Sequence, residues 1–261
     1  MSIIKEYVKI SLKKTFTYKI NKYLIFFEVF FDFLGLLLFW ATLYHMDAVI
    51  ANWTRVELVC LVGFNTLNNS VGSLLIAFRD IDYKITDGAF DSYFMKPQHP
   101  LFTMIFERAN FFIVILFFVL GMIVVCASSI YMNANILQIV FAVFMSLVAT
   151  MSINILYAII SLFSFKFGRT TYIRDTIFVA KGLSNYPMDL FPQIVYKFCT
   201  YIIPLAFIST FPVKILSDAN NMKTMLEYSL INVLLMLAFM AIFVLIWKKM
   251  IKLYESTGVS R

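Results

Sequence analysis

Two carboxylates lie in the first apolar run of the chain, Glu28 and Asp32, and they are the residues whose type and position most clearly suggest a chemical role. They lie four residues apart and therefore share one face of a helix. A carboxylate at membrane depth is costly and by default marks a functional site or a buried partner. Three roles are open to this pair: attraction of a cationic substrate, a proton site, or an ion pair with Lys181 or Arg108.

A second polar pattern follows in the next apolar run, "VELVCLVGFNTLNNSVGSLLIAF". Asn65, Asn69 and Ser73 recur every four residues and share a helix face. An amide facing lipid is unfavourable, so this stripe should point into a helix bundle or toward a second membrane subunit. It either holds helices together or, with Glu28 and Asp32, lines a path for a substrate.

The other reactive residues form no catalytic or metal-binding pattern. The two histidines, His45 and His99, are far apart, and the three cysteines stand singly in apolar surroundings: Cys60, Cys126 and Cys199. No CxxC pair or zinc-type spacing occurs, and no GxxxxGK[ST] loop that would bind ATP. An integral-membrane enzyme would need His, Asp or Glu clusters at the membrane edge, so it is a weaker alternative.

The elements that must position these residues are membrane helices. The chain is 61% hydrophobic and 14% charged, against about 45–50% and 25% in soluble domains. We therefore expect an all-α polytopic membrane protein. The formal charge of +7 does not indicate a nucleic-acid partner, because the basic residues cluster beside apolar runs. It is better interpreted as a topology signal.

Five apolar runs are each long enough for a crossing of about 20 residues. They cover 23–46, 56–78, 102–128, 136–165 and 226–247. Asn133 and Asn135 supply the turn between the third and fourth runs. Lysines cluster before the first run and after the last, so the positive-inside rule places both termini in the cytoplasm. An even number of crossings is then required, and we predict six transmembrane helices.

The missing crossing must lie within 166–224, where two candidates remain open. Residues 170–186 have helical character but carry three charged side chains, and 198–211 are more apolar but short and broken by Pro204. Breaks of this kind are tolerated at membrane depth only where protein covers the backbone or a wet cavity adjoins it.

The N-terminal residues 1–22 have the pattern of an amphipathic helix in the headgroup region. Lys5, Lys9 and Lys13 share one face and apolar side chains occupy an adjacent stripe. The alternative is a disordered basic tail.

A polar island at 79–101 joins the second and third crossings on the cytoplasmic side. Asp87-Gly88 is a turn pair, the aromatic residues Phe90, Tyr93 and Phe94 follow at helical spacing, and Pro97 ends the short helix. A helix with an aromatic face and a charged rim is typical of a docking element for a partner protein. The alternative is a plain connector.

The island sequence "TDGAFDSYFMKPQHPLF" resembles the cytoplasmic-loop signature of membrane-spanning (permease) subunits of type-two ATP-binding-cassette (ABC) exporters. It is most similar to the multidrug or antibiotic-export branch. Two further stretches resemble motifs of this family: "NYPMDLFPQIVYKFCTYIIPLAFISTFPVKIL" at 185–216 and "KLYESTG" at 252–258.

The resemblance implies a single permease domain over 1–261 that moves an amphipathic substrate outward across the bacterial cytoplasmic membrane. The substrate would be a drug, antibiotic, peptide or lipid-like compound. The chain would hold no cofactor, because ATP and Mg would be bound by a separate cytoplasmic ATPase. Two ATPase subunits would pair with two permeases, identical or homologous, in contact with membrane lipid.

The resemblance also assigns parts of the chain. Residues 1–22 would be an elbow helix, and 85–97 a coupling helix seated in a groove of the ATPase. The fifth crossing would lie near 171–186, with Lys181 facing a wet interior or snorkelling, and 187–213 would form re-entrant short helices. The implied coupling residues are Asp87, Gly88, Phe90, Asp91, Tyr93, Phe94, Lys96 and Pro97.

Among these coupling residues, we expect the three aromatic side chains to be the apolar anchors in the ATPase. Asp87, Asp91 and Lys96 would supply orientation and charge matching. A rival from another class is an ion-coupled secondary transporter, which only Glu28 and Asp32 favour, because no internal repeat is visible in the sequence.

Overall fold

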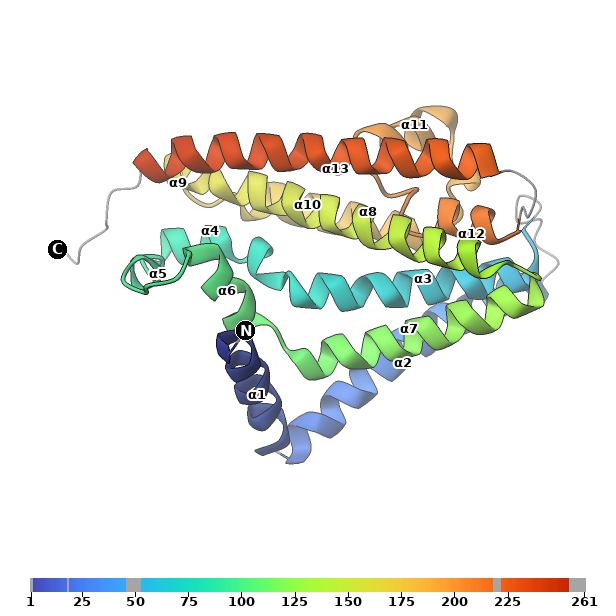
Figure 1. The fold of residues 1–261 in the computed structure, drawn as a ribbon, viewed down its shortest axis with the longest axis horizontal. Helices are drawn as coiled ribbons and strands as arrows, with labels where there is room; N and C mark the ends of the chain where they lie inside the picture. Colours follow the sequence, from blue (N-terminus) through green and yellow to red (C-terminus); the bar gives the residue numbers. More distant parts are fainter. Residues whose placement is uncertain (1, 18, 46–52, 218–221, 254–261) are drawn as a thin grey trace.

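Residues 2–17, 19–45, 53–217 and 222–253 are described by the computed structural model, and every regular element in these ranges is a helix. Five long helices form the body of the molecule (Figure 1). They are α2 (Lys19–His45), α3 (Arg55–Leu74), α7 (Phe111–Tyr131), α8 (Ile136–Leu162) and α13 (Met222–Met250). In the described ranges, four helical segments are long and apolar enough to cross a membrane, and they include α2, α7, α8 and α13. The prediction of an all-α, multi-pass membrane protein is confirmed.

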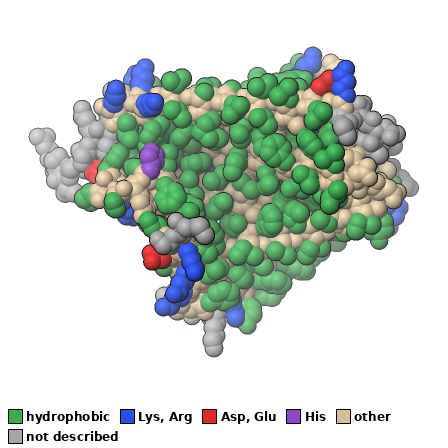
Figure 2. Space-filling model, in the orientation of Figure 1, with side chains coloured by type: hydrophobic (Ala, Val, Ile, Leu, Met, Phe, Trp, Pro, Cys, Tyr) green, Lys and Arg blue, Asp and Glu red, His purple; other side chains and the backbone are tan. Residues whose placement is uncertain are grey.

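The surface has the polarity expected in a bilayer. Figure 2 shows a broad hydrophobic face over the long helices, with Lys and Arg side chains gathered toward its two ends. Exposed large apolar residues occur along α2, α7, α8 and α13, among them Phe31, Ile123, Val140 and Leu245. An apolar surface of this extent needs lipid or a partner to cover it.

Helix α3 is an interior helix that carries polar side chains, and it packs against α7 and α8. Its residues Leu58, Leu61 and Phe64 are buried. The Asn68 side-chain amide donates to Ser146 Oγ at 3.0 Å and to the Ile208 carbonyl at 3.1 Å. Because neighbouring segments accept hydrogen bonds from the Asn68 amide N–H groups, α3 can carry polar residues that a lipid-facing helix could not.

Close packing of α3 on α7 depends on two glycines. A methyl group at Gly121 would lie 2.6 Å from the Leu67 backbone nitrogen, and one at Gly63 would lie 2.8 Å from Val124 Cγ1. Small residues at these points let the two backbones approach closely, as in many membrane helix pairs.

Gly121→Ala is therefore expected to destabilise the protein by about 1–3 kcal/mol, the usual effect of overpacking. The thermal unfolding midpoint in detergent measures this. Gly35→Ala is the matched control, because a methyl group at Gly35 meets nothing within 4 Å. An equal, small change in both variants would contradict this account of the helix contact.

A line of contacts runs beside α3 from one end to the other. It is made by α10 (Thr171–Lys181), η2 (Gly182–Asn185) and η3 (Met188–Leu190). Lys181 Nζ donates to Asn69 Oδ1 at 3.3 Å, Ser184 Oγ to Asn65 Oδ1 at 2.9 Å, and Trp53 Nε1 to Asp189 Oδ2 at 3.2 Å. Residues 181–189 therefore run antiparallel to residues 53–69, which include most of α3.

The short helices gather at the two ends of the bundle (Figure 1). One end, called here the loop end, holds η1 (Ile76–Arg79), α4 (Ile81–Thr86), α5 (Asp91–Phe94), α6 (Pro100–Arg108), α9 (Ser164–Phe167) and η4 (Ile251–Leu253). The opposite end holds α11 (Gln193–Tyr201) and α12 (Thr210–Ser217). Helix α1 (Ser2–Thr17) lies across the direction of the long helices and packs on α2, α6 and α7.

The predicted third crossing, 102–128, is wrong at its start. The chain breaks after α6, and α7 begins at Phe111, where the Asn110 side chain accepts from the Phe112 and Ile113 amides. Ser11 on α1 stabilises the break, since its hydroxyl donates to the Ala109 carbonyl and accepts from the Phe111 amide. Asn110 is an N-cap residue, a local signal that the apolar run concealed.

Other predicted limits shift by smaller amounts. The second run was expected to reach residue 78, but α3 ends at Leu74 and a separate 3-10 helix follows. The amphipathic stretch 1–22 divides between α1 and the start of α2. Asn133 has a left-handed backbone, φ 55°, and makes the predicted turn before α8. The end of the first predicted run, residue 46, and most of the 252–258 motif lie outside the described residues.

Candidate functional site

The loop between α3 and α6 is fastened to the chain by aromatic packing. Phe90 is fully buried and Tyr93 is 2% exposed. The Phe90 ring packs edge-on against Phe94 at 5.2 Å, Phe165 at 5.6 Å and Trp247 at 6.3 Å. These contacts join the loop to α9, which follows α8, and to the C-terminal end of α13.

This packing corrects the expected role of two residues. Phe90 and Tyr93 were predicted to be surface anchors for a partner, but their side chains fill the protein's own core. Phe94 is 41% exposed and Met95 is 81% exposed. These two apolar side chains are exposed beside α5, and Tyr83 on α4 is 42% exposed as well.

The turn and helix of the loop are shorter than the predicted 85–97 helix. Gly88 has φ 72° and supplies the turn expected at Asp87-Gly88. Helix α5 covers only Asp91–Phe94, and α6 begins at Pro100, whose fixed φ suits the first turn of a helix. The loop is therefore a compact turn between two short helices.

Exposed ion pairs rim this turn. Arg169 pairs with Asp87 at 3.1 Å, and Lys96 pairs with Glu107 at 2.9 Å. The hydrogen bond to the Glu107 carboxylate raises the pKa of the Lys96 ammonium, so it stays charged at neutral pH. Pro97 is exposed and Asp91 is half-buried.

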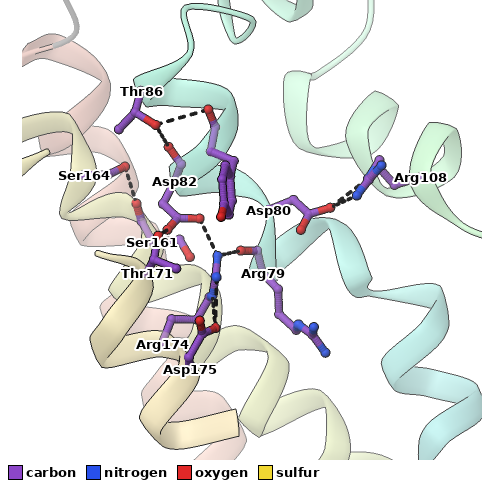
Figure 3. Close-up of polar contacts among 11 residues, drawn as sticks. Arg79, Asp80, Asp82, Thr86, Arg108, Ser161, Ser164, Thr171, Arg174 and Asp175 are labelled. Carbon is purple, nitrogen blue, oxygen red and sulfur yellow. Dashed lines mark hydrogen bonds and ion pairs between the residues drawn. The ribbon is translucent and has the colours of Figure 1, made fainter. Parts of the chain in front are cut away.

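A buried ion pair ties the loop to α10 (Figure 3). Arg174 Nη1 lies 2.6 Å from Asp82 Oδ1, and the two side chains are 7% and 0% exposed. Thr171 Oγ1 donates to the other Asp82 oxygen at 2.9 Å. Arg174 also donates to the Arg79 carbonyl and to Asp175. The loop and α10 are therefore one connected unit.

Sequence reasoning did not predict this pair. Residues 82 and 174 are far apart in the chain, and no local pattern links them. Arg108, which was one possible partner for Glu28 or Asp32, pairs instead with Asp80. That alternative is wrong.

A cavity of about 370 Å³ lies between α2, α3, α10 and η2. Its lining is half polar and half apolar: Asp32, Leu36, Asn65, Thr66, Asn69, Phe178, Val179, Lys181, Gly182, Ser184 and Asn185. Asn69 stands between two charges, because its Nδ2 donates to Asp32 Oδ2 at 3.1 Å and its Oδ1 accepts from Lys181 Nζ at 3.3 Å. These neighbours settle the orientation of the amide.

Comparison with protein families matches residues 30–258 to the family described as ABC-2 family transporter protein. This chain belongs to the ABC-2 transporter family. Neither the curated proteins nor the solved structures contain a match. The predicted kinship with type-two ABC permease subunits is thus confirmed. The family implies a membrane-embedded transport subunit that works with an ATPase partner.

The ABC-2 permease brings together only part of the predicted substrate path. Asp32, Asn65 and Asn69 line the cavity, whereas Glu28 and Ser73 are not among its lining residues. Asn65 also donates to the Ser184 carbonyl at 2.9 Å and accepts from its hydroxyl. Asn65 therefore holds helices together and borders the cavity at once, so the two interpretations of the stripe do not exclude each other.

Proposed function

We propose that this permease exports an amphipathic substrate, such as a drug, antibiotic, peptide or lipid-like molecule, and that a separate ATPase drives it by docking on the 79–101 loop. The observation that carries the proposal is the attachment of that loop. Its aromatic residues pack on the segments after α8 and at the end of α13, and its Asp82 is paired with Arg174 on α10. A displacement of the loop would therefore move several helices together.

The proposed topology has six crossings: α2, α3, α7, α8, the α10–η3 segment and α13. Helix α10 alone has 11 residues, or about 16 Å of helix, which is too short for the bilayer core of about 30 Å. The contacts of Thr171 and Arg174 with the 79–82 segment and of 181–189 with residues 53–69 support a crossing completed by η2 and η3. Helices α11 and α12 would then be the re-entrant pair.

The loop end would face the cytoplasm together with both termini. Lys248, Lys249 and Lys252 lie near the end of α13, which agrees with the positive-inside rule. The crosswise position of α1 supports its role as an elbow helix at the inner surface. The bacterial cytoplasmic membrane is the proposed location, and the unit is one permease domain over 1–261.

The proposed complex contains two ATPase subunits, which bind ATP and Mg, and a second permease, identical or homologous. Phe94 and Met95 would lie at the centre of the interface with the ATPase, and Asp87 and Lys96 would lie at its charged rim. Gly88 and Pro97 would shape the turn, and Asp91 would begin its helix. Phe90 and Tyr93 are buried and would not touch the ATPase; they would hold the turn in place.

Phe94→Ala with Met95→Ala is expected to weaken association with the ATPase about thirtyfold, since truncating a side chain at the centre of an interface costs about 1 kcal/mol or more. The measurement is titration of the ATPase that co-purifies with the wild-type permease. Tyr131→Ala, which removes a 79% exposed side chain at the opposite end of the bundle, is the control. Unchanged affinity and unchanged ATP hydrolysis in the double variant would reduce the loop to a connector.

A further inference from the structure

Two cations beside the cavity lack a carboxylate partner. In the described part of the chain, neither Lys181 nor Arg79 has an Asp or Glu oxygen within the 4.0 Å of an ion pair. All other arginines at the loop end, Arg108, Arg169 and Arg174, do have such partners. Cations in a membrane protein interior normally pair with an anion, so the missing counter-charge is informative.

Lys181 keeps most of its donor capacity free of protein partners. Its ammonium has three N–H donors, and its one hydrogen bond in the described residues is to Asn69 Oδ1. Asp32 is bonded to the other end of that same amide. Asp32 therefore orients Asn69 toward Lys181 and does not neutralise the ammonium by direct contact.

Arg79 adds a second positive charge from the loop end of α3. Its guanidinium lies over the ring of Phe178, 4.1 Å from the centroid, and Phe178 lines the cavity. In Figure 3 the Arg79 side chain points away from Asp80 and Asp82, to which Arg108 and Arg174 are bonded.

The space in front of Lys181 is open and bordered by apolar groups. A methyl group at Gly72 would lie 3.7 Å from Lys181 Nζ, so any larger side chain there would reach the ammonium. Leu36, Phe178 and Val179 supply an apolar wall beside it. The cavity thus offers a positive charge next to a surface suited to a hydrocarbon tail.

We propose that this cavity binds the anionic head group, a carboxylate or phosphate, of an amphipathic substrate, with Lys181 as its ion-pair partner and Arg79 reinforcing the positive field. The inference rests on the proposed export function and names its substrate class. It differs from one of the three roles left open for Glu28 and Asp32, the attraction of a cationic substrate. Lipid-derived and soluble amphiphiles share this head-group chemistry.

The test measures binding to the permease alone, in nanodiscs of uncharged lipid. Fluorescent dodecyl chains ending in phosphate, carboxylate, hydroxyl or trimethylammonium serve as probes, read by anisotropy. The phosphate and carboxylate probes are expected to bind about tenfold tighter than the hydroxyl probe, the usual scale of a charge-assisted contact. A fluorescent anionic phospholipid against a soluble acyl phosphate separates the two sources.

Lys181→Met is expected to abolish the preference for anionic probes, while Lys197→Gln, at an exposed lysine on α11, leaves it unchanged. Gly72→Leu keeps the charge but blocks access to it, so it should also abolish the preference, whereas Gly72→Ala should retain it. Folding of each variant is checked by its unfolding midpoint.

Equal affinity for all four probes, tightest binding of the trimethylammonium probe, or a preserved anionic preference in both Lys181→Met and Gly72→Leu would overturn the proposal. Because no ATPase is present in the binding assay, these outcomes are independent of docking on the 79–101 loop. Loss of ATPase association with anionic binding intact would instead contradict only the proposed coupling.

Discussion

Replacing Arg174 with methionine should destabilise the protein by about 3–5 kcal/mol, because it leaves Asp82 as an unpaired buried charge. Asp82 is fully buried and bonded to Arg174 and Thr171. Removing the arginine also deprives the Arg79 carbonyl of its donor. The loop should detach from α10 before the bundle itself unfolds.

The measurement is the thermal unfolding midpoint together with limited proteolysis of the loop. Arg169→Met is the matched control, because its ion pair with Asp87 is more than half exposed on both sides and should contribute no more than about 1 kcal/mol. The double variant Asp82→Leu with Arg174→Met should recover most of the lost stability, since apolar replacement of both partners is often neutral. Equal unfolding midpoints for the Arg174 and Arg169 variants would show that the buried ion pair stabilises the protein no more than the exposed one.

Phe90→Ala should have an effect of similar size, about 3–5 kcal/mol, which is typical of a large buried aromatic side chain. Phe90 is fully enclosed, and its ring contacts Phe165 and Trp247 from two other parts of the chain. Its removal would leave a cavity under the loop that the three surrounding segments cannot close without moving.

Two comparisons separate this structural role from a docking role. Phe90→Leu should retain most of the stability, and Phe94→Ala with Met95→Ala should lower ATPase affinity with little change in unfolding midpoint. If Phe90→Ala unfolded at the wild-type temperature and yet lost ATPase association, Phe90 would contact the partner directly, and the packing in the loop would have to rearrange on docking.

The sequence was sufficient for the class of fold and for several turns. Hydropathy located α2, α7, α8 and α13 because lipid exposure demands continuous apolar runs, and that demand is local to each helix. The turns at Asn133 and Gly88 were predictable because left-handed backbone favours these residue types. The family kinship followed from motifs in the right order along the chain.

The candidate site was predictable only in part. Asp32, Asn65 and Asn69 were recognised because polar side chains in an apolar run stand out. Whether each of these residues lines the cavity or packs between helices depends on which helix lies opposite it, and only the folded structure shows this. The break at Asn110 was hidden because a cap residue has little effect on the hydropathy of its surroundings.

The sequence by itself determined that this is a helical membrane protein of the ABC-2 kind, with a polar loop set between apolar helices. Only the tertiary structure decided that Asp82 meets Arg174, that Phe90 points inward, and that Lys181 lines a cavity. Among the residues that the structure describes, Lys181 has no carboxylate within ion-pair distance. The reason is physical: apolarity and turn preference act between near neighbours in the chain. Ion pairs and aromatic packing act between residues that only folding brings together.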